Sequence, residues 1–227
     1  MDFLNSIILL TNFIIVPGIT YGSQLALGAI GVTLIYGVLR FANFAYGDLM
    51  AFGTMVVILM TWYLQSKGIS FGLLPTALLA LPIGILLTIA VSLFFDKTVF
   101  EYYRNKKSNP VTFIVVSLGI MFVLNAVVRI IIGPNDINFM DGHKFIMKAR
   151  EFKQLTGLNE GLAIKSTQVI TLVTTIITCS ILFYFLNKTK TGKSMRAYSN
   201  NEDLALLSGI DPKKIVLITW VIVSILA

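Results

Sequence analysis

Residues 72–95 read GLLPTALLALPIGILLTIAVSLFF and contain no charged side chain. A helix needs about 20 mainly apolar residues to cross a hydrocarbon core of roughly 30 Å, and this run is long enough. It therefore predicts a transmembrane helix. The class of the protein then depends on how many further runs of this kind the chain holds.

The composition of the whole chain agrees with a membrane protein. Of its 227 residues, 56% are hydrophobic and 13% are charged, and the mean hydropathy is +0.83. Soluble domains carry about 25% charged residues. The net charge of +7 comes from basic residues that flank apolar runs, so it indicates membrane topology and not nucleic-acid binding. The single cysteine, Cys179, lies in an apolar run and is interpreted as a small core residue.

Six more apolar segments are predicted to enter or cross the membrane. They comprise residues 4–16, 19–39, 48–65, 111–132, 167–186 and 215–227. The segment 4–16 is short and ends at Pro17-Gly18, so it either crosses as a short span or lies at the membrane interface. Together the segments predict an all-α fold, a polytopic transmembrane helix bundle that forms a single domain over residues 1–227.

The last segment, 215–227, is uninterrupted but stops before it could cross a bilayer, since a helix rises about 1.5 Å per residue. We expect the sequence to be a fragment, or a protein truncated relative to its working form. A terminal half-span buried in an oligomer is the alternative.

Basic residues orient the helices, because cytoplasmic loops carry an excess of Lys and Arg. The loops at residues 96–110 and 187–214 hold such residues and are predicted to be cytoplasmic. Their basic residues are Lys97, Arg104, Lys106, Lys107, Lys188, Lys190, Lys193, Arg196, Lys213 and Lys214. Alternation then places the long loop 133–166 outside, and it places the N-terminus inside if residues 4–16 cross.

Within the second cytoplasmic loop, residues 199–212 read SNNEDLALLSGIDP and contain a complete set of helix boundary signals. Ser199 or Asn200 can cap a helix whose first turn holds Glu202 and Asp203, where the helix dipole favours anions. Gly209 can take the left-handed conformation that ends a helix. Asp211 is expected to cap a second helix, with Pro212 at its first position.

The predicted short helix, residues 200–208, has an apolar edge of Leu204 and Leu207, continued by Ile210. Helices below about 12–15 residues are marginal on their own in water, so this one is expected to rest on a partner. The residues leave two partners open: another protein, or the headgroups of the lipid bilayer.

Polar residues at membrane depth call for an explanation, because a charge at the centre of a span costs about 2.5–3.5 kcal/mol. Gln24, Asn43 and Asp48 are candidates for lining a translocation path, although Gln24 and Asn43 fit interhelical hydrogen bonds better. Asp48 either pairs with Arg40 or both are solvated. Arg129 near the outer end of its span is expected to reach the interface. Asn125 is a further polar residue within that span.

Two local patterns concern packing. The stretch Phe41–Gly47 is too short for a domain and is interpreted as a re-entrant or kinked connection covered by protein. Small residues recur in the first strong span and predict close helix packing. They are Gly18, Gly22, Ala26, Gly28 and Gly31.

The sequence offers no motif for catalysis or for a cofactor. Gly192-Lys193-Ser194 resembles the end of a P-loop, but Asn187 stands where that motif needs glycine, and a span precedes it in place of a strand. His143 is the only histidine and has no cysteine near it, so neither a metal site nor a nucleophile–base pair is expected. We expect a protein that is not an enzyme and binds no cofactor.

Three segments resemble the permease subunits of branched-chain amino acid (LIV-type) ABC importers. Residues 28–40 (GAIGVTLIYGVLR), followed by NFAYGDL at 43–49, are similar to a family motif, with Tyr46 in place of the usual histidine. Ser117-Leu-Gly-Ile120, Asn125 and Gly133-Pro-Asn135 resemble the central span and its exit. The third segment contains Arg196, Ala197, Asp203, Ala205, Gly209 and Ile210. It resembles the loop that contacts the ATPase, with Asp203 where glutamate is commoner.

The resemblance implies a multi-pass permease of the cytoplasmic (inner) membrane of a prokaryote, without catalysis of its own. It implies four partner chains: a second homologous permease, two cytoplasmic ATPase subunits that hydrolyse ATP, and an extracytoplasmic solute-binding protein. Arg196, Asp203, Ala205, Gly209 and Ile210 are the implied ATPase-coupling residues. Importers of urea or short amides share the architecture, and a secondary transporter or channel is the alternative from another class.

Overall fold

The computed structural model describes the chain except for residues 1, 70–73, 136–138, 140, 142–144 and 157–159. Helices dominate the described part, which also holds two short antiparallel strands, β1 (Phe145–Met147) and β2 (Ile164–Lys165). Among the described residues, five helical segments are long and apolar enough to cross a membrane. They are Phe3–Leu39, Tyr46–Ser66, Ala77–Asn105, Pro110–Ile132 and Ser166–Lys188. The all-α, polytopic helix bundle predicted from the sequence is therefore confirmed.

The N-terminal helix is continuous, and the expected break at Pro17-Gly18 is wrong. Helix α1 (Asp2–Leu10) runs through a π-helical turn (Thr11–Ile15) into α2 (Val16–Leu39). The Val16 N–H donates to the Thr11 carbonyl, five residues back, and Pro17 follows at once in the first turn of α2. Inside a transmembrane helix a proline is tolerated where a local π-helical adjustment satisfies the backbone groups that it frees. Residues 4–16 thus extend the first span and are not a separate one.

The following three long helices pack around the first of them. Helix α3 (Tyr46–Ser66) packs against α4 (Ala77–Phe95) and against α6 (Pro110–Ile132). The start of the predicted span 72–95 falls partly outside the described residues. Helix α4 continues through a π-helical segment (Asp96–Phe100) into α5 (Glu101–Asn105). The expected loop 96–110 is therefore mostly helical, since Asp96, Lys97 and Arg104 lie in turns that extend α4, whereas Lys106 and Lys107 follow the end of α5.

The second half of the chain contains more helix than expected outside the spans. The predicted outer loop 133–166 holds β1, α7 (Ala149–Thr156) and β2. Helix α8 (Ser166–Lys188) leads to α9 (Lys190–Asn200), which lies in the segment expected to be a loop. Helices α10 (Glu202–Leu207) and α11 (Pro212–Leu226) complete the chain. Helix α11 packs against α2 and α4, and α8 packs against α2.

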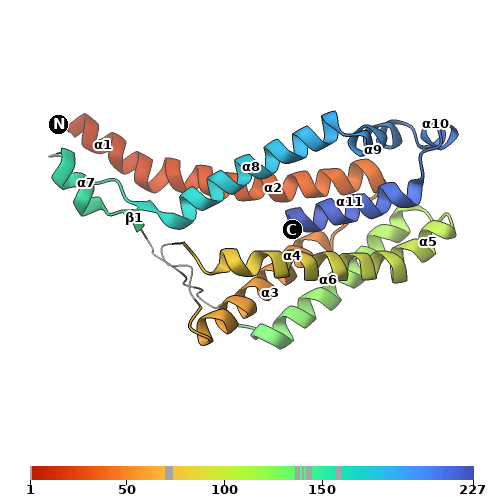
Figure 1. The fold of residues 1–227 in the computed structure, drawn as a ribbon, viewed down its shortest axis with the longest axis horizontal. Helices are drawn as coiled ribbons and strands as arrows, with labels where there is room; N and C mark the ends of the chain where they lie inside the picture. The colour runs from red at the N-terminus through yellow and green to blue at the C-terminus, as the bar shows by residue number, and fades with distance from the viewer. Residues whose placement is uncertain (1, 70–73, 136–138, 140, 142–144, 157–159) are drawn as a thin grey trace.

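The two predicted cytoplasmic loops meet at one end of the bundle. Figure 1 shows α5, α9 and α10 at this end, whereas the N-terminus, α7 and β1 lie at the opposite end. At that opposite end, Asn12 accepts a hydrogen bond from the Ala163 N–H (3.1 Å) and donates one to the Gly161 carbonyl (3.1 Å). The residues expected inside and those expected outside are thus separated along the long axis.

Aromatic stacking fixes the connection between α2 and α3. Phe41 stacks on Phe113 at 5.0 Å and lies 5.2 Å from Phe100, which in turn stacks on Trp220. All four rings are buried. The stretch 41–47 is therefore a kinked connection covered by protein, as its composition indicated. Four elements meet at this aromatic cluster, so it defines the centre of the core.

Glycines allow close approach at two helix crossings, but not at the spacing expected. A Cβ added to Gly31 would overlap the hydroxyl group and ring of Tyr46, and one added to Gly84 would overlap Val57. No described atom lies within 4 Å of a Cβ built at Gly18 or Gly22. Within the described chain, the close packing in α2 involves its second half and not the Gly18/Gly22 pair.

Candidate functional site

The short helix α10 is bounded by local signals of the kind that the sequence predicted. Its cap is Asn201, whose Oδ1 accepts from the Leu204 N–H at 3.0 Å; the expected caps Ser199 and Asn200 lie in α9 instead. Glu202 and Asp203 occupy the first turn. Asn201 has the extended backbone that a cap needs, which allows α9 to run on to residue 200.

The end of α10 is a Schellman motif. Gly209 has a φ of 79°, its N–H donates to the Leu206 carbonyl (3.0 Å), and the Ile210 N–H donates to the Ala205 carbonyl (3.1 Å). These are the paired hydrogen bonds of that motif, and a residue with a Cβ is strained at this φ. Asp211 then caps α11 by accepting from the Lys213 N–H at 2.9 Å. The predicted stop and restart are both present.

Two of the predicted coupling residues hold α10 on its own chain. Ala205 is buried and packs with Val38, Met195 and Tyr198, and Ile210 lies against the same cluster. The expected apolar edge of Leu204, Leu207 and Ile210 is therefore partly wrong. Ile210 lies beyond the helix end, where the chain reverses and helical spacing no longer applies.

The remaining apolar side chains of α10 face away from the protein. Leu204, Leu206 and Leu207 are 61%, 43% and 85% exposed. Asp203 and Gly209 are also exposed, as is Arg196 on α9, whose guanidinium donates to Asn187 Oδ1 at 3.0 Å. We call the three exposed leucines with Asp203 the α10 outer face. It is a small apolar surface with an acidic residue at one end.

Polar contacts tie α10 and α9 to the ends of the long helices. The Tyr198 hydroxyl donates to Glu202 Oε1 at 2.7 Å, and Ser199 Oγ donates to the Gly37 carbonyl at 2.7 Å. The Arg40 guanidinium donates to the Ser199 carbonyl. Burial, with a further contribution from Glu202, raises the pKa of Tyr198, so the phenol remains protonated and continues to donate. Helix α10 is therefore bonded to α9, and α9 to the end of α2.

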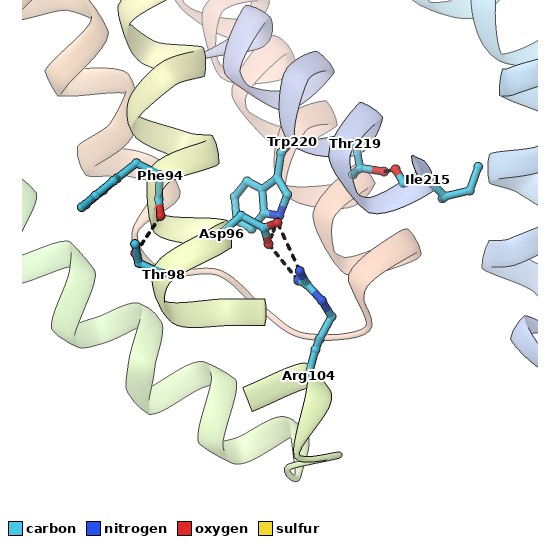
Figure 2. Close-up of polar contacts among 7 residues, drawn as sticks. All are labelled: Phe94, Asp96, Thr98, Arg104, Ile215, Thr219 and Trp220. Atoms are coloured by element: carbon cyan, nitrogen blue, oxygen red, sulfur yellow. Dashed lines mark hydrogen bonds and ion pairs between the residues drawn. The ribbon is translucent and has the colours of Figure 1, made fainter. Parts of the chain in front are cut away.

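A second polar cluster joins three segments at the same end, and the sequence did not reveal it. Asp96 accepts two hydrogen bonds from Arg104 (2.8 and 3.1 Å) and one from the Trp220 indole N–H (2.7 Å), as Figure 2 shows. The carboxylate is 14% exposed. Asp96 and Arg104 lie eight positions apart, and the π-helical segment that begins at Asp96 changes the helical register between them. The only signal in the sequence was an acid and a base at the end of one span.

Asp48 and Arg40 do not pair, because each has a different partner. Asp48, in the first turn of α3, accepts from Asn125 Nδ2 at 2.9 Å. Asn125 Oδ1 in turn accepts from Arg129 Nε at 2.8 Å. Arg129 is exposed but directed to Asn125. A polar relay thus links α3 and α6 where the sequence suggested three unrelated residues.

The other two candidates for a translocation path lie elsewhere. Asn43 is 8% exposed, and its Oδ1 accepts from the Ala45 N–H at 3.1 Å, which forms an Asx turn just before α3. Gln24 is exposed on α2. No side-chain hydrogen bond in the described part of the chain links Gln24, Asn43 and Asp48. Asn43 therefore shapes the kinked connection.

The structure gives no support for a metal centre. Among the described residues there is no group of three or more His, Cys, Asp or Glu side chains that could hold an ion. His143 lies outside the described residues. What the arrangement offers instead is an exposed helical surface at one end of the bundle and charged residues within the apolar spans.

The described chain is a polytopic helix bundle with polar residues inside its spans and a short capped helix, α10, after its last long span, which is the architecture of an integral membrane protein. Residues 14–227 match the family described as "Branched-chain amino acid transport system / permease component", and the chain belongs to this family. No solved structure matches the chain.

Three curated relatives carry corresponding names. The chain is 25% identical to the high-affinity branched-chain amino acid transport system permease protein LivH of Escherichia coli K12, over 92% of this chain and 66% of the relative. It is 25% identical to BraD of Pseudomonas aeruginosa, over 94% and 67%. It is 27% identical to a probable branched-chain amino acid transport permease of Methanocaldococcus jannaschii, over 95% and 64%. The chain thus spans about two thirds of the length of these relatives.

Proposed function

We propose that this protein is the permease subunit of an ABC importer that carries branched-chain or related amino acids across the cytoplasmic membrane of a prokaryote. Its proposed partners are a second homologous permease, two cytoplasmic ATPase subunits and an extracytoplasmic solute-binding protein. Family membership and the names of the relatives support a transport subunit. The observation that carries the ABC assignment is the α10 outer face.

The α10 outer face has the properties of a docking surface for a separate protein. Its three leucines are exposed at the end of the bundle where the basic residues predicted to be cytoplasmic gather. Full burial of a leucine is worth about 1.5–3 kcal/mol, so a partner that covers them gains a substantial contact. A secondary transporter or channel would not account for the exposed α10 outer face.

The contacts of α10 supply a route from such a partner to the spans. A force on the outer face reaches α9 through the Glu202–Tyr198 hydrogen bond and reaches α11 through the turn at Gly209. Helix α11 is bonded through Trp220 to Asp96, at the end of the α4 span. ATP-driven closure of the ATPases would in this way alter the packing of the transmembrane helices.

The proposal is tested by uptake of radiolabelled leucine into cells that lack their own transporters and express the complete transporter with its ATPase and binding-protein genes. We expect uptake that stops when a P-loop lysine of the ATPase is replaced. Uptake that continues without ATP hydrolysis would indicate a secondary transporter. Uptake of labelled urea in place of leucine would retain the ABC architecture and reject the amino acid substrate.

A further inference from the structure

The relay Asp48–Asn125–Arg129 begins in the first turn of α3 and runs to the last turn of α6, near the outer end of that span. Arg40, at the end of α2, contacts Ser199 at the predicted cytoplasmic end, whereas the Phe44 N–H already donates to Ser117 within α6 at 3.1 Å. Asn125 lies two further turns along α6, about 22 Å from the start of that helix at 1.5 Å per residue. The kinked connection therefore carries Asp48 deep into the bundle.

An acidic group at this depth needs a reason, because insertion of a charge near the centre of a span is unfavourable. Asp48 is half-buried and sits at the start of α3, where the helix dipole favours an anion. Its side-chain hydrogen bonding with described residues involves Oδ1 alone. The second carboxylate oxygen thus retains the capacity to accept a hydrogen bond from a cationic ligand.

The side-chain amide of Asn125 lies between the two charged groups, with its donor toward Asp48 and its acceptor toward Arg129. Its NH₂ donates to the Asp48 carboxylate at 2.9 Å, and its carbonyl oxygen accepts from the Arg129 guanidinium at 2.8 Å. An α-amino acid zwitterion has the same polarity, since its ammonium group donates and its carboxylate accepts. A carboxylate and a guanidinium on either side of one polar group therefore form a complementary frame for a zwitterion.

We propose that Asp48 binds the ammonium group, and Arg129 the carboxylate, of the α-amino acid during translocation, with Asn125 bridging the two when no substrate is present. This inference rests on the proposed function, because it names the groups of the amino acid substrate that the path recognises. It also distinguishes the transporter from one for urea or amides, which carry no charged pair.

The test measures direct binding to the complete transporter, purified in detergent without its solute-binding protein, so that the selectivity of that protein does not enter. Three probes compete for labelled leucine at about pH 6.5, where α-amino groups are charged. They are leucine, leucinamide, which lacks the carboxylate, and 4-methylpentanoate, which lacks the ammonium group. In the wild type we expect each analogue to bind at least about tenfold more weakly than leucine, since a charge-assisted hydrogen bond is lost.

Two variants, Asp48→Asn and Arg129→Gln, are each expected to abolish the preference for one of the two charged groups of leucine. Asp48→Asn should bind leucine and 4-methylpentanoate about equally and still prefer leucine over leucinamide. Arg129→Gln should bind leucine and leucinamide about equally and still prefer leucine over 4-methylpentanoate. Asp48→Glu should restore part of the lost preference. Thr54→Val, an exposed position of α3 whose hydroxyl donates to the Met50 carbonyl of its own helix, is the matched control and should behave as wild type.

If the relay were purely structural, the substitutions would weaken the binding of all three ligands to the same extent, and that result would overturn the inference. A wild-type transporter that does not bind leucine would also overturn it. If Asp48→Asn does not fold, the exposed Arg129→Gln decides the question alone. Leucine uptake by the wild-type transporter with its binding protein, measured in parallel, separates the two proposals. Absence of leucine uptake rejects the proposed function. Uptake by a transporter that binds leucine and its analogues equally well rejects only the zwitterion site.

Discussion

The indole N–H of Trp220 donates to Asp96 Oδ1 at 2.7 Å and thereby connects α11 to the end of the α4 span. Arg104 completes the cluster with two further hydrogen bonds to the same carboxylate. Trp220 also stacks on Phe100, so a polar and an apolar contact act on one side chain. These contacts restrict the position of α11 relative to the end of the α4 span, so the proposed coupling movement would have to pass through this junction.

Replacement of Trp220 by Phe should separate the two contacts at this junction. Stacking on Phe100 is retained and the hydrogen bond to Asp96 is lost, at a cost of about 0.5–1.5 kcal/mol. Arg104→Ala should cost more, about 1–3 kcal/mol, because it leaves the carboxylate partly unsatisfied. Thermal unfolding of the detergent-solubilised protein measures both. A larger effect for Trp220→Phe than for Arg104→Ala would contradict this ranking.

Replacement of Gly209 by Val should uncouple ATP hydrolysis from uptake. The φ of 79° is strained for a β-branched residue, so the Schellman turn and the position of α10 should both change. Gly209→Asn is the control, since asparagine tolerates the left-handed conformation. Reconstituted transporter should show ATPase activity with less than about a tenth of the uptake, in line with a turn strained by more than about 1 kcal/mol. Normal uptake by the Gly209→Val variant would show that this turn is not needed to couple ATP hydrolysis to uptake.

Leu207→Asp should weaken the association of the ATPase with the permease. This side chain is 85% exposed, so the change places a charge on the docking surface without disturbing the fold. We expect a loss of at least about tenfold in affinity, corresponding to one buried leucine. Ser208→Ala, a neighbouring exposed position, should have no effect. Co-purification and thermal stability distinguish lost docking from misfolding; equal ATPase recovery with both variants would show that the partner binds elsewhere.

Gly31→Ala should destabilise the protein by about 1–3 kcal/mol, because the added methyl group overlaps Tyr46 between α2 and α3. Gly22→Ala lies on the same helix with no described atom within 4 Å of the new Cβ, and it should be neutral or slightly stabilising. The difference between the unfolding temperatures of the two variants in detergent measures the effect of the overlap between residue 31 and Tyr46. Equal effects of the two substitutions would argue against close packing at Gly31.

Local signals were the most predictable part of the candidate site. The stop at Gly209 and the cap Asp211-Pro212 depend on a few neighbouring residues, and the structure has both where the sequence indicated them. The first cap was displaced to Asn201, since Ser, Asn and Asn in succession offer equivalent side chains. The break at Pro17 was wrong because a π-helical turn before the proline is not encoded by a recognisable motif.

The membrane bundle and its family follow from the sequence alone. Long apolar runs have few alternatives to forming helices in a bilayer, and the motifs of the family are local. Only the tertiary structure decided which polar residues meet. Asp48 meets Asn125 rather than Arg40, and Asp96 meets Trp220, because these pairs depend on the path of the kinked connection and on the packing of distant helices. Such contacts are set by three-dimensional register, which residue spacing does not contain.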